Sequence, residues 1–198
     1  MRHAEVEADY QGVFGGRIDM DLSPNGVRQA TALAKYLHGK PMDVLYASPM
    51  KRVQQTLAPL LLNGIPSPVV LHDLREVDFG DWTGLRWGQV QVKYGISPFT
   101  WLAQLERAGI PNAECAETLR ARIEPCLRRI LRDHAGRQIA IACHGGVIRV
   151  LLALLFDWPL SRMAAFEVDY ASLTQVALFP DGPRFQLVNF TPWREMEL

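Results

Sequence analysis

The chain has 198 residues, 48% hydrophobic and 21% charged, which is typical of one soluble globular domain. Its formal net charge is zero, so we expect no general attraction to nucleic acid or to an anionic membrane. The three cysteines form no CxxC pair, and neither a signal segment nor a membrane span is apparent, so we expect a cytoplasmic protein.

The first third of the chain predicts two helices and two strands. Ser23 suits a helix N-cap and Pro24 suits the first helical position, and apolar residues then recur at helical spacing. Residues 42–47 (MDVLYA) are apolar and short, which is typical of a buried strand. A second helix is expected over about 48–62 and a second strand at 69–71.

An irregular stretch separates these elements from the next ones. Residues 78–113 are rich in Gly, Trp and Pro and follow no single period, which predicts short helices and loops. A helix is then expected over 118–134, with a kink at Pro125. A buried strand at 138–142 and a helix over 146–156 follow.

The alternation of strands and helices predicts the fold class. Two or three more strands are expected near 165–189. Strands that alternate with helices form a mostly parallel sheet, so we expect a three-layer α/β/α sandwich in a single domain, residues 1–198. Ligands bind such sheets at the carboxyl ends of the strands. His3, Arg52 and His144 each follow a predicted strand end, so they can converge there.

Four short motifs carry the residues that indicate chemistry. They are RHAE (2–5), SPMKRVQQT (48–56), LREVDFGDW (74–82) and CHGG (143–146), with Arg2, His3, Arg52, Glu76 and His144. Two guanidiniums and two imidazoles can surround a phosphoryl group without a metal, and a carboxylate can protonate a leaving oxygen. Taken singly, each residue is more often a solvated or packed side chain. Cys143 should point away from His144 and be buried, because side chains alternate along a strand.

Together and in this order, the motifs resemble those of the histidine phosphatase superfamily, which includes the phosphoglycerate mutases. RHAE resembles R-H-G-E, and CHGGVIR resembles S-H-G-G-x-I-R. The second motif resembles S-P-x-x-R-x-x-Q-T and the third resembles L-x-E-x-x-F-G-x-W-E-G. Residues 15–30 also resemble the stretch that follows the nucleophile in the family. The resemblance covers essentially the whole chain and implies a phosphoglycerate mutase-like fold, on the phosphatase branch.

The resemblance implies a role for each matching residue. His3 would be the nucleophile that forms a phosphohistidine, with a pKa lowered by the neighbouring guanidiniums. Glu76 would be the general acid toward the leaving oxygen and then the general base for water. Arg2, Arg52 and His144 would complete the catalytic set. These three residues would also bind the substrate, together with Gly15, Gly16 and Gly145. Neither a cofactor nor a metal ion is implied.

Several positions depart from the family pattern. Ala4 replaces a glycine, which is a small change where φ is negative. Asp9 stands where many members carry an Asn, so we expect it to turn away, to pair with an arginine such as Arg17, or to hold a proton. Thr83 replaces a Glu. Only Met1 precedes the first motif, where the family has a central strand, so we expect the natural protein to begin several residues upstream.

The resemblance leaves several functions open. A phosphatase that hydrolyses a small phosphomonoester without a metal is favoured because the chain is short. A phosphoglycerate mutase, an α-ribazole phosphate phosphatase and a non-catalytic binding protein remain alternatives. Besides the small-molecule substrate we expect no nucleic-acid or membrane partner, and a homodimer remains open.

The irregular stretch 78–113 is expected to cap the pocket and to choose the substrate. It carries four aromatic residues of interest, Trp82, Trp87, Phe99 and Trp101. Their density suggests a leaving group with an apolar or ring-bearing part, although core packing explains tryptophans at least as often.

Overall fold

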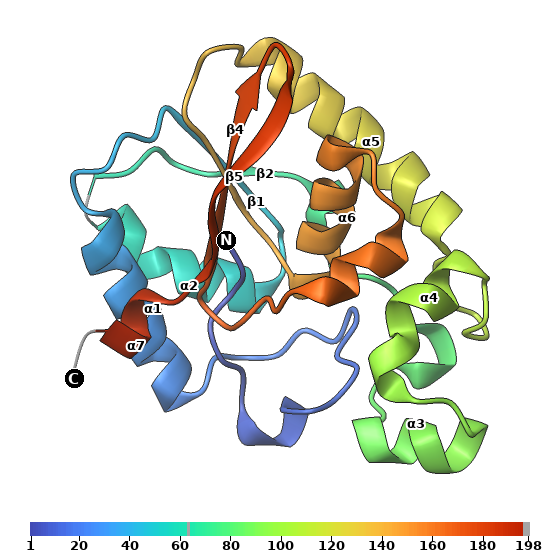
Figure 1. The fold of residues 1–198 in the computed structure, drawn as a ribbon. Coiled ribbons are helices and arrows are strands. Elements are labelled where there is room, and N and C mark those ends of the chain that lie inside the picture. Colours follow the sequence, from blue (N-terminus) through green and yellow to red (C-terminus); the bar gives the residue numbers. More distant parts are fainter. Residues whose placement is uncertain (63, 196–198) are drawn as a thin grey trace.

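A small parallel sheet lies at the centre of the computed structural model, which describes residues 1–62 and 64–195 (Figure 1). The strands are β1 (Val44–Ala47), β2 (Val69–Val70), β3 (Ile139–Ala142), β4 (Leu173–Phe179) and β5 (Gly182–Phe190). β1 lies between β2 and β3, and all three run parallel. β4 and β5 form an antiparallel hairpin.

The first residues of the chain take part in this strand arrangement. Arg2 forms a parallel bridge with Cys143 at the end of β3, and the amide of His3 donates to the Cys143 carbonyl oxygen at 3.1 Å. On the other side, the Arg2 amide donates to Ser172 O at 3.1 Å and the Ala171 amide donates to His3 O at 3.0 Å. Backbone pairing on both sides therefore fixes Arg2 and His3 beside the carboxyl end of β3.

We expected a further strand before the first motif. In the structure, the amine of Met1 donates to Ile141 O at 2.7 Å, and the amide of Cys143 donates to Met1 O at 3.0 Å. Met1 is thus already paired with β3 and its extension.

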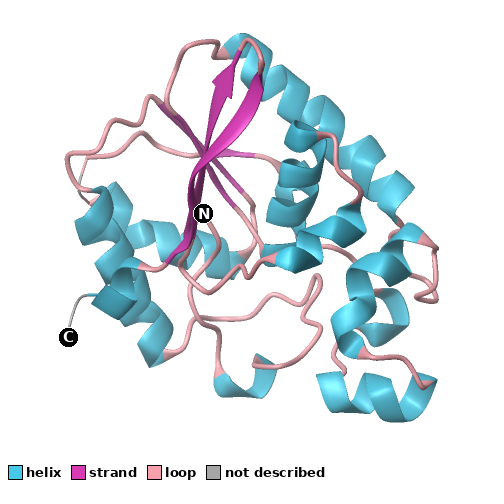
Figure 2. Ribbon diagram, viewed as in Figure 1, coloured by secondary structure: helices cyan, strands magenta, loops and turns pink. Residues whose placement is uncertain are grey.

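Helices cover both faces of the sheet (Figures 1 and 2). The helices are α1 (Pro24–Leu37), α2 (Lys51–Leu61), α3 (Trp87–Tyr94), α4 (Trp101–Glu106), α5 (Ala116–Asp133), α6 (Gly145–Phe156) and α7 (Pro192–Glu195). Leu45 and Ala47 of β1 pack with α1 and α2, whereas Tyr46 between them packs with α5 and α6. This alternation gives each face its own core and confirms the predicted α/β/α layering.

Most predicted elements are present with shifted ends. The hydroxyl of Ser23 accepts a hydrogen bond from the Gly26 amide at 2.9 Å, which confirms the predicted N-cap. α2 begins at Lys51 rather than near 48, because Met50 is still extended and Ser48 precedes a proline. α5 continues through Pro125 as a single helix. In the described residues two strands, β4 and β5, follow α6.

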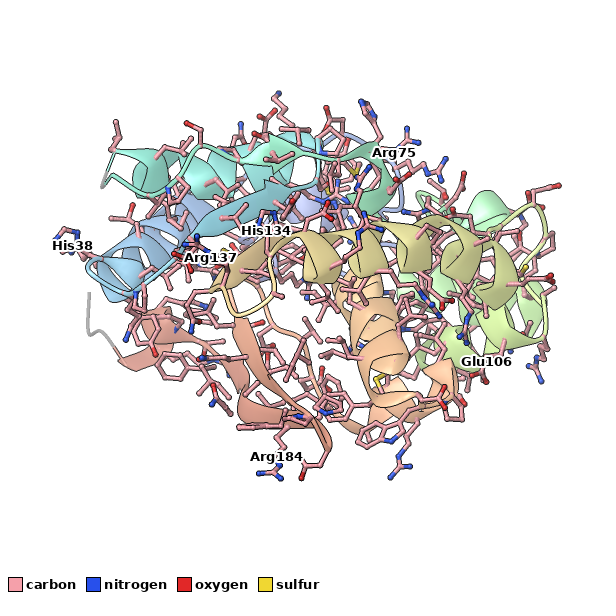
Figure 3. All side chains as sticks on the ribbon, turned by 90° about the horizontal axis from the view of Figure 1, so that it is seen from above. His38, Arg75, Glu106, His134, Arg137 and Arg184 are labelled. Carbon is pink, nitrogen blue, oxygen red and sulfur yellow. The ribbon has the colours of Figure 1, made fainter. Side chains whose placement is uncertain are left out.

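The irregular stretch 78–113 contains α3, α4 and two 3-10 turns, as expected. Figure 1 shows α3 and α4 together, beside α6 and away from α1 and α2. Glu106, the last residue of α4 (labelled in Figure 3), connects this stretch to the segment after α6. Its carboxylate accepts a hydrogen bond from the Ser161 amide at 2.8 Å. Among residues 1–62 and 64–195 we find no helix with both the length and the apolar character needed to cross a bilayer.

An ion pair holds the segment 73–78 against α5. The guanidinium of Arg122 binds the carboxylate of Glu114 through two hydrogen bonds of 2.9 and 2.8 Å. It also donates to Asp73 O and, at 2.9 Å, to Arg75 O. Glu114 in turn accepts a hydrogen bond from the Asp78 amide at 2.9 Å. The backbone is thus held on both sides of position 76.

We predict that Arg122→Gln will loosen this segment. Loss of these charge-assisted bonds should lower the free energy of unfolding by about 1–3 kcal/mol and raise deuterium uptake across 73–78. The control is Arg120→Gln on the same helix, because Arg120 is 60% exposed and pairs only with Glu124 in its turn. An exposed pair is worth about 0–1 kcal/mol. Equal uptake in the two variants would contradict the prediction.

Candidate active site

A pocket of about 440 Å³ opens beside the carboxyl ends of β1 and β3. Seven of the residues predicted for the site line it: Arg2, His3, Arg52, Glu76, Gly15, Gly16 and Gly145. His144 is fully buried and does not line the pocket, but its ring centroid lies 5.3 Å from that of His3. The fold therefore brings the predicted site residues together, with His144 behind the pocket surface.

The hydrogen bonds of His3 define its tautomer. Nδ1 lies 2.8 Å from the carbonyl oxygen of Ala4, which can only accept, so Nδ1 carries the proton. Nε2 receives a hydrogen bond from Nε of Arg52 at 3.2 Å, and a guanidinium can only donate. Nε2 therefore has a free electron pair, which is the form of imidazole that can act as a nucleophile.

The surroundings of His3 keep its imidazole neutral. Burial is the main cause that lowers its pKa well below 6.5, and the charges of Arg52 and Arg2 lower it further. The bond to Ala4 opposes these effects. The sequence indicated the guanidiniums as the cause, whereas the structure gives burial the larger share.

The second imidazole, His144, is held by Ser48. Nε2 of His144 lies 2.7 Å from the Ser48 hydroxyl, which also accepts a hydrogen bond from the Met50 amide at 3.3 Å. Burial, followed by the charge of Arg52, lowers the pKa of His144 well below 6.5. Nδ1 is buried and has no hydrogen-bond partner among the described residues.

Two guanidiniums are anchored to backbone carbonyls at the pocket. Arg52 is 2% exposed and donates to the 16–18 loop with bonds of 2.8 and 3.0 Å. Arg2 donates to Val168 O at 2.6 Å and lies 4.1 Å above the ring of Tyr170. Its Nε is buried without a partner among the described residues. In that part of the chain, neither guanidinium forms an ion pair with a carboxylate.

Glu76 faces this group from the segment 73–78. Its carboxylate accepts hydrogen bonds from the Val77 amide at 2.9 Å and from the Gly146 amide, in the first turn of α6, at 3.3 Å. Arg75 points the other way, to the outer surface (Figure 3). The extended backbone at Arg75 explains why neighbouring side chains diverge and why only Glu76 reaches the pocket.

The arrangement suits an anion with several oxygens. Buried cations without a counter-charge and buried donors without a partner are costly, unless a ligand supplies both. The unpartnered nitrogens Arg2 Nε and His144 Nδ1, with the N-terminus of α6, suit a phosphoryl group, and His144 Nδ1 contributes in the tautomer that carries its proton there. Among the described residues, no group of three His, Cys, Asp or Glu is placed to hold a metal ion.

The positions that depart from the family pattern are resolved by the structure. Asp9 is exposed in a 3-10 turn and does not line the pocket, so it turns away. Arg17 does not pair with it; it pairs with Glu114 at 3.1 Å and Asp78 at 3.6 Å. Ala4 does not have a positive φ, so its side chain fits the backbone.

Two smaller expectations also have an outcome. Cys143 is fully buried in the core, as expected, and burial raises the pKa of its thiol to about 12. A Cys–His dyad would need a thiolate, so the thiol does not take part in the site. The hydroxyl of Thr83 is buried without a partner among the described residues, and nothing in the structure explains the replacement.

Arg149 and Tyr170 are among the pocket-lining residues that sequence reasoning missed. Arg149 lies one helical turn after Gly145 and donates to Gly145 O at 3.2 Å, so helical spacing within CHGGVIR indicated it. Tyr170 packs against both Arg2 and His3 from the loop before β4. No local pattern marks it, because only the tertiary fold brings that loop to the pocket.

Comparison with known proteins agrees with this geometry. Residues 1–191 match the model of the histidine phosphatase superfamily (branch 1). The adenosylcobalamin/alpha-ribazole phosphatase of Escherichia coli (strain K12) is 29% identical over 170 residues, which are 85% of this chain and 83% of that protein. A 2,3-bisphosphoglycerate-dependent phosphoglycerate mutase of Methylobacterium radiotolerans is 32% identical over 174 residues, which are 78% of this chain and 76% of that protein.

The fold is shared with solved structures. The native structure of a mycobacterial glucosyl-3-phosphoglycerate phosphatase superposes with a TM-score of 0.81 at 25% identity and covers 95% of both chains. The relatives are thus phosphatases and a mutase on one fold. With the family model covering 1–191 and the motifs gathered at one pocket, this chain belongs to the histidine phosphatase superfamily.

Proposed function

We propose that the protein is a phosphatase that hydrolyses a small phosphomonoester through a phosphohistidine at His3, without a metal ion. One observation carries the proposal. A neutral imidazole with an unprotonated Nε2 lies beside two guanidiniums that form no ion pair with a carboxylate in the described residues, and beside buried nitrogens without a partner there. Phosphoryl transfer needs mainly such positioning and charge neutralisation.

In the first step, Nε2 of His3 attacks phosphorus. The hydrogen bond from Arg52 to Nε2 gives way, the N–P bond forms and the ester P–O bond breaks. The leaving oxygen takes a proton from Glu76. The bond from Nδ1 to Ala4 O then stabilises the positive charge on the imidazole.

In the second step, water attacks the phosphohistidine. Glu76 takes a proton from the water, an O–P bond forms, the N–P bond breaks and His3 regains its free electron pair. Arg2 and Arg52 bind the equatorial oxygens in both steps. Ser48 acts as a positioning residue: its hydroxyl donates to Nε2 of His144, which leaves Nδ1–H free to donate to a phosphoryl oxygen.

A mutase is the second candidate, because a phosphoglycerate mutase is 32% identical to this chain. The two activities differ in whether water or a substrate hydroxyl accepts the phosphoryl group from His3. Incubation with 3-phosphoglycerate separates them, since inorganic phosphate indicates hydrolysis and 2-phosphoglycerate indicates transfer. The likeness to an α-ribazole phosphatase makes α-ribazole phosphate a natural member of any substrate panel.

We predict that His3→Asn will lower phosphate release from p-nitrophenyl phosphate by about 10³-fold or more, because the covalent route is lost. Radiolabelled phosphoryl donor should label the wild-type chain with an acid-labile, base-stable adduct and leave the variant unlabelled. Activity should persist in EDTA. His38→Asn is the control, because His38 is exposed and lies at the periphery (Figure 3). Unchanged turnover in His3→Asn would refute the proposal.

The neutral state of the imidazoles predicts how stability depends on pH. The pKa values of His3 and His144 lie well below the 6.5 of an unfolded chain. Below pH 6.5 the unfolded chain therefore binds more protons, and stability falls as the pH falls. Each histidine should contribute roughly 1 kcal/mol of loss between pH 7.5 and 5.5.

Urea unfolding at the two pH values checks this prediction. His3→Gln should remove roughly 1 kcal/mol of the pH-dependent loss, because glutamine does not titrate. His38→Gln should leave it unchanged. Equal stability of the wild-type protein at pH 7.5 and 5.5 would show that the imidazoles are protonated in the folded state.

A further inference from the structure

We infer that the pocket selects phosphomonoesters whose alcohol carries an aromatic ring, and that Trp87 and Phe99 bind this ring. The inference rests on the proposed function for the phosphoryl end of the substrate. It concerns the other end of the same pocket, where the leaving alcohol lies.

The structure separates the aromatic residues of the irregular stretch into two kinds. Trp82 is fully buried in the core and does not line the pocket, so packing explains it. Trp87 and Phe99 line the pocket while they remain 47% and 72% exposed. Their rings meet edge to face with centroids 5.7 Å apart. In the free protein, these two large aromatic side chains therefore leave much of their apolar surface in contact with water.

The apolar wall continues from this pair into the pocket. Trp101 also lines it and packs edge to face on Phe79 with centroids 5.4 Å apart, and Phe14 packs on Phe79 at 5.0 Å. These residues come largely from 79–102, whereas Arg2, His3, Arg52 and Glu76 come from other parts of the chain. The two sets meet where the guanidinium of Arg149, on α6, lies 5.8 Å from the ring of Trp101. One pocket thus presents charge on one set of elements and aromatic surface on another.

This division matches a ligand with a doubly charged head and a ring. The phosphoryl group would accept hydrogen bonds from the charged end of the pocket. The ring of the ligand would cover the exposed surface of Trp87 and Phe99, which otherwise faces water. Edge-to-face and stacked ring contacts add to the burial of apolar area. Burying a phenyl ring is worth about 1.5–3 kcal/mol, which corresponds to roughly 10–100-fold in affinity.

Paired ligands with the same kind of leaving oxygen test the inference. For the full chain, we would measure kcat/KM for 2-phenylethyl phosphate and ethyl phosphate, which are both esters of primary alcohols. Calorimetry with the matching phosphonates, 2-phenylethylphosphonate and ethylphosphonate, measures binding without turnover. We expect the arylated member to be favoured about tenfold or more in both measurements.

Variants assign the preference to the two rings. Trp87→Ala and Phe99→Ala should each lower the ratio between the arylated and the ethyl ligand by about 3–10-fold. Val92→Ala is the matched control, because Val92 lies on α3 like Trp87, is 87% exposed and does not line the pocket. Its ratio should equal that of the wild-type protein.

A ratio near one in the wild-type protein would overturn the inference. A high ratio that neither Trp87→Ala nor Phe99→Ala lowers would overturn it too, because the ring would then bind elsewhere. If neither ester releases phosphate but the phosphonates still differ tenfold, the proposed hydrolysis fails while ring recognition stands. If both esters are hydrolysed at equal rates, the phosphatase stands and ring recognition fails.

Discussion

The hydrogen bond from Nδ1 of His3 to the carbonyl oxygen of Ala4 is the constraint on which the site depends. It fixes which nitrogen carries the proton and turns the free electron pair of Nε2 toward Arg52 and the pocket. Burial beside two guanidiniums keeps the ring neutral, and the bonds to Ala4 and from Arg52 select the same tautomer. The backbone of residues 2 and 3 can hold this geometry because it is paired on both sides, with Cys143 and with the loop before β4.

The second feature of the site is a pair of guanidiniums, the buried Arg52 and the half-buried Arg2. Arg2 and Arg52 satisfy part of their donors with backbone carbonyls rather than carboxylates. This keeps the guanidiniums in place without cancelling their charge, so a bound anion gains the full attraction. The carboxylate of Glu76 accepts hydrogen bonds from two amides, one of them in the first turn of α6. It lines the same pocket as the guanidiniums but forms no ion pair in the described residues.

Rigid and adaptable parts of the pocket come from different regions of the chain. The charged groups lie on the sheet edge and on a segment tied down by Arg122 and Glu114. The aromatic wall belongs to the irregular stretch, whose Trp87 and Phe99 are largely solvent-exposed. The relatives share one fold, while their names specify different substrates.

The sequence by itself determined the alternating order of strands and helices, the Ser23 N-cap and most of the predicted site residues that meet at the pocket. These depend on local patterns, namely hydrophobic period, cap chemistry and short motifs at strand ends. Only the tertiary structure decided that burial outweighs the guanidiniums in lowering the His3 pKa, that Arg17 pairs with Glu114, and that Tyr170 joins the pocket. It also separated the core residue Trp82 from the pocket residue Trp87. The physical reason is that burial, long-range ion pairs and pocket walls arise between segments far apart in the chain, where no local pattern records them.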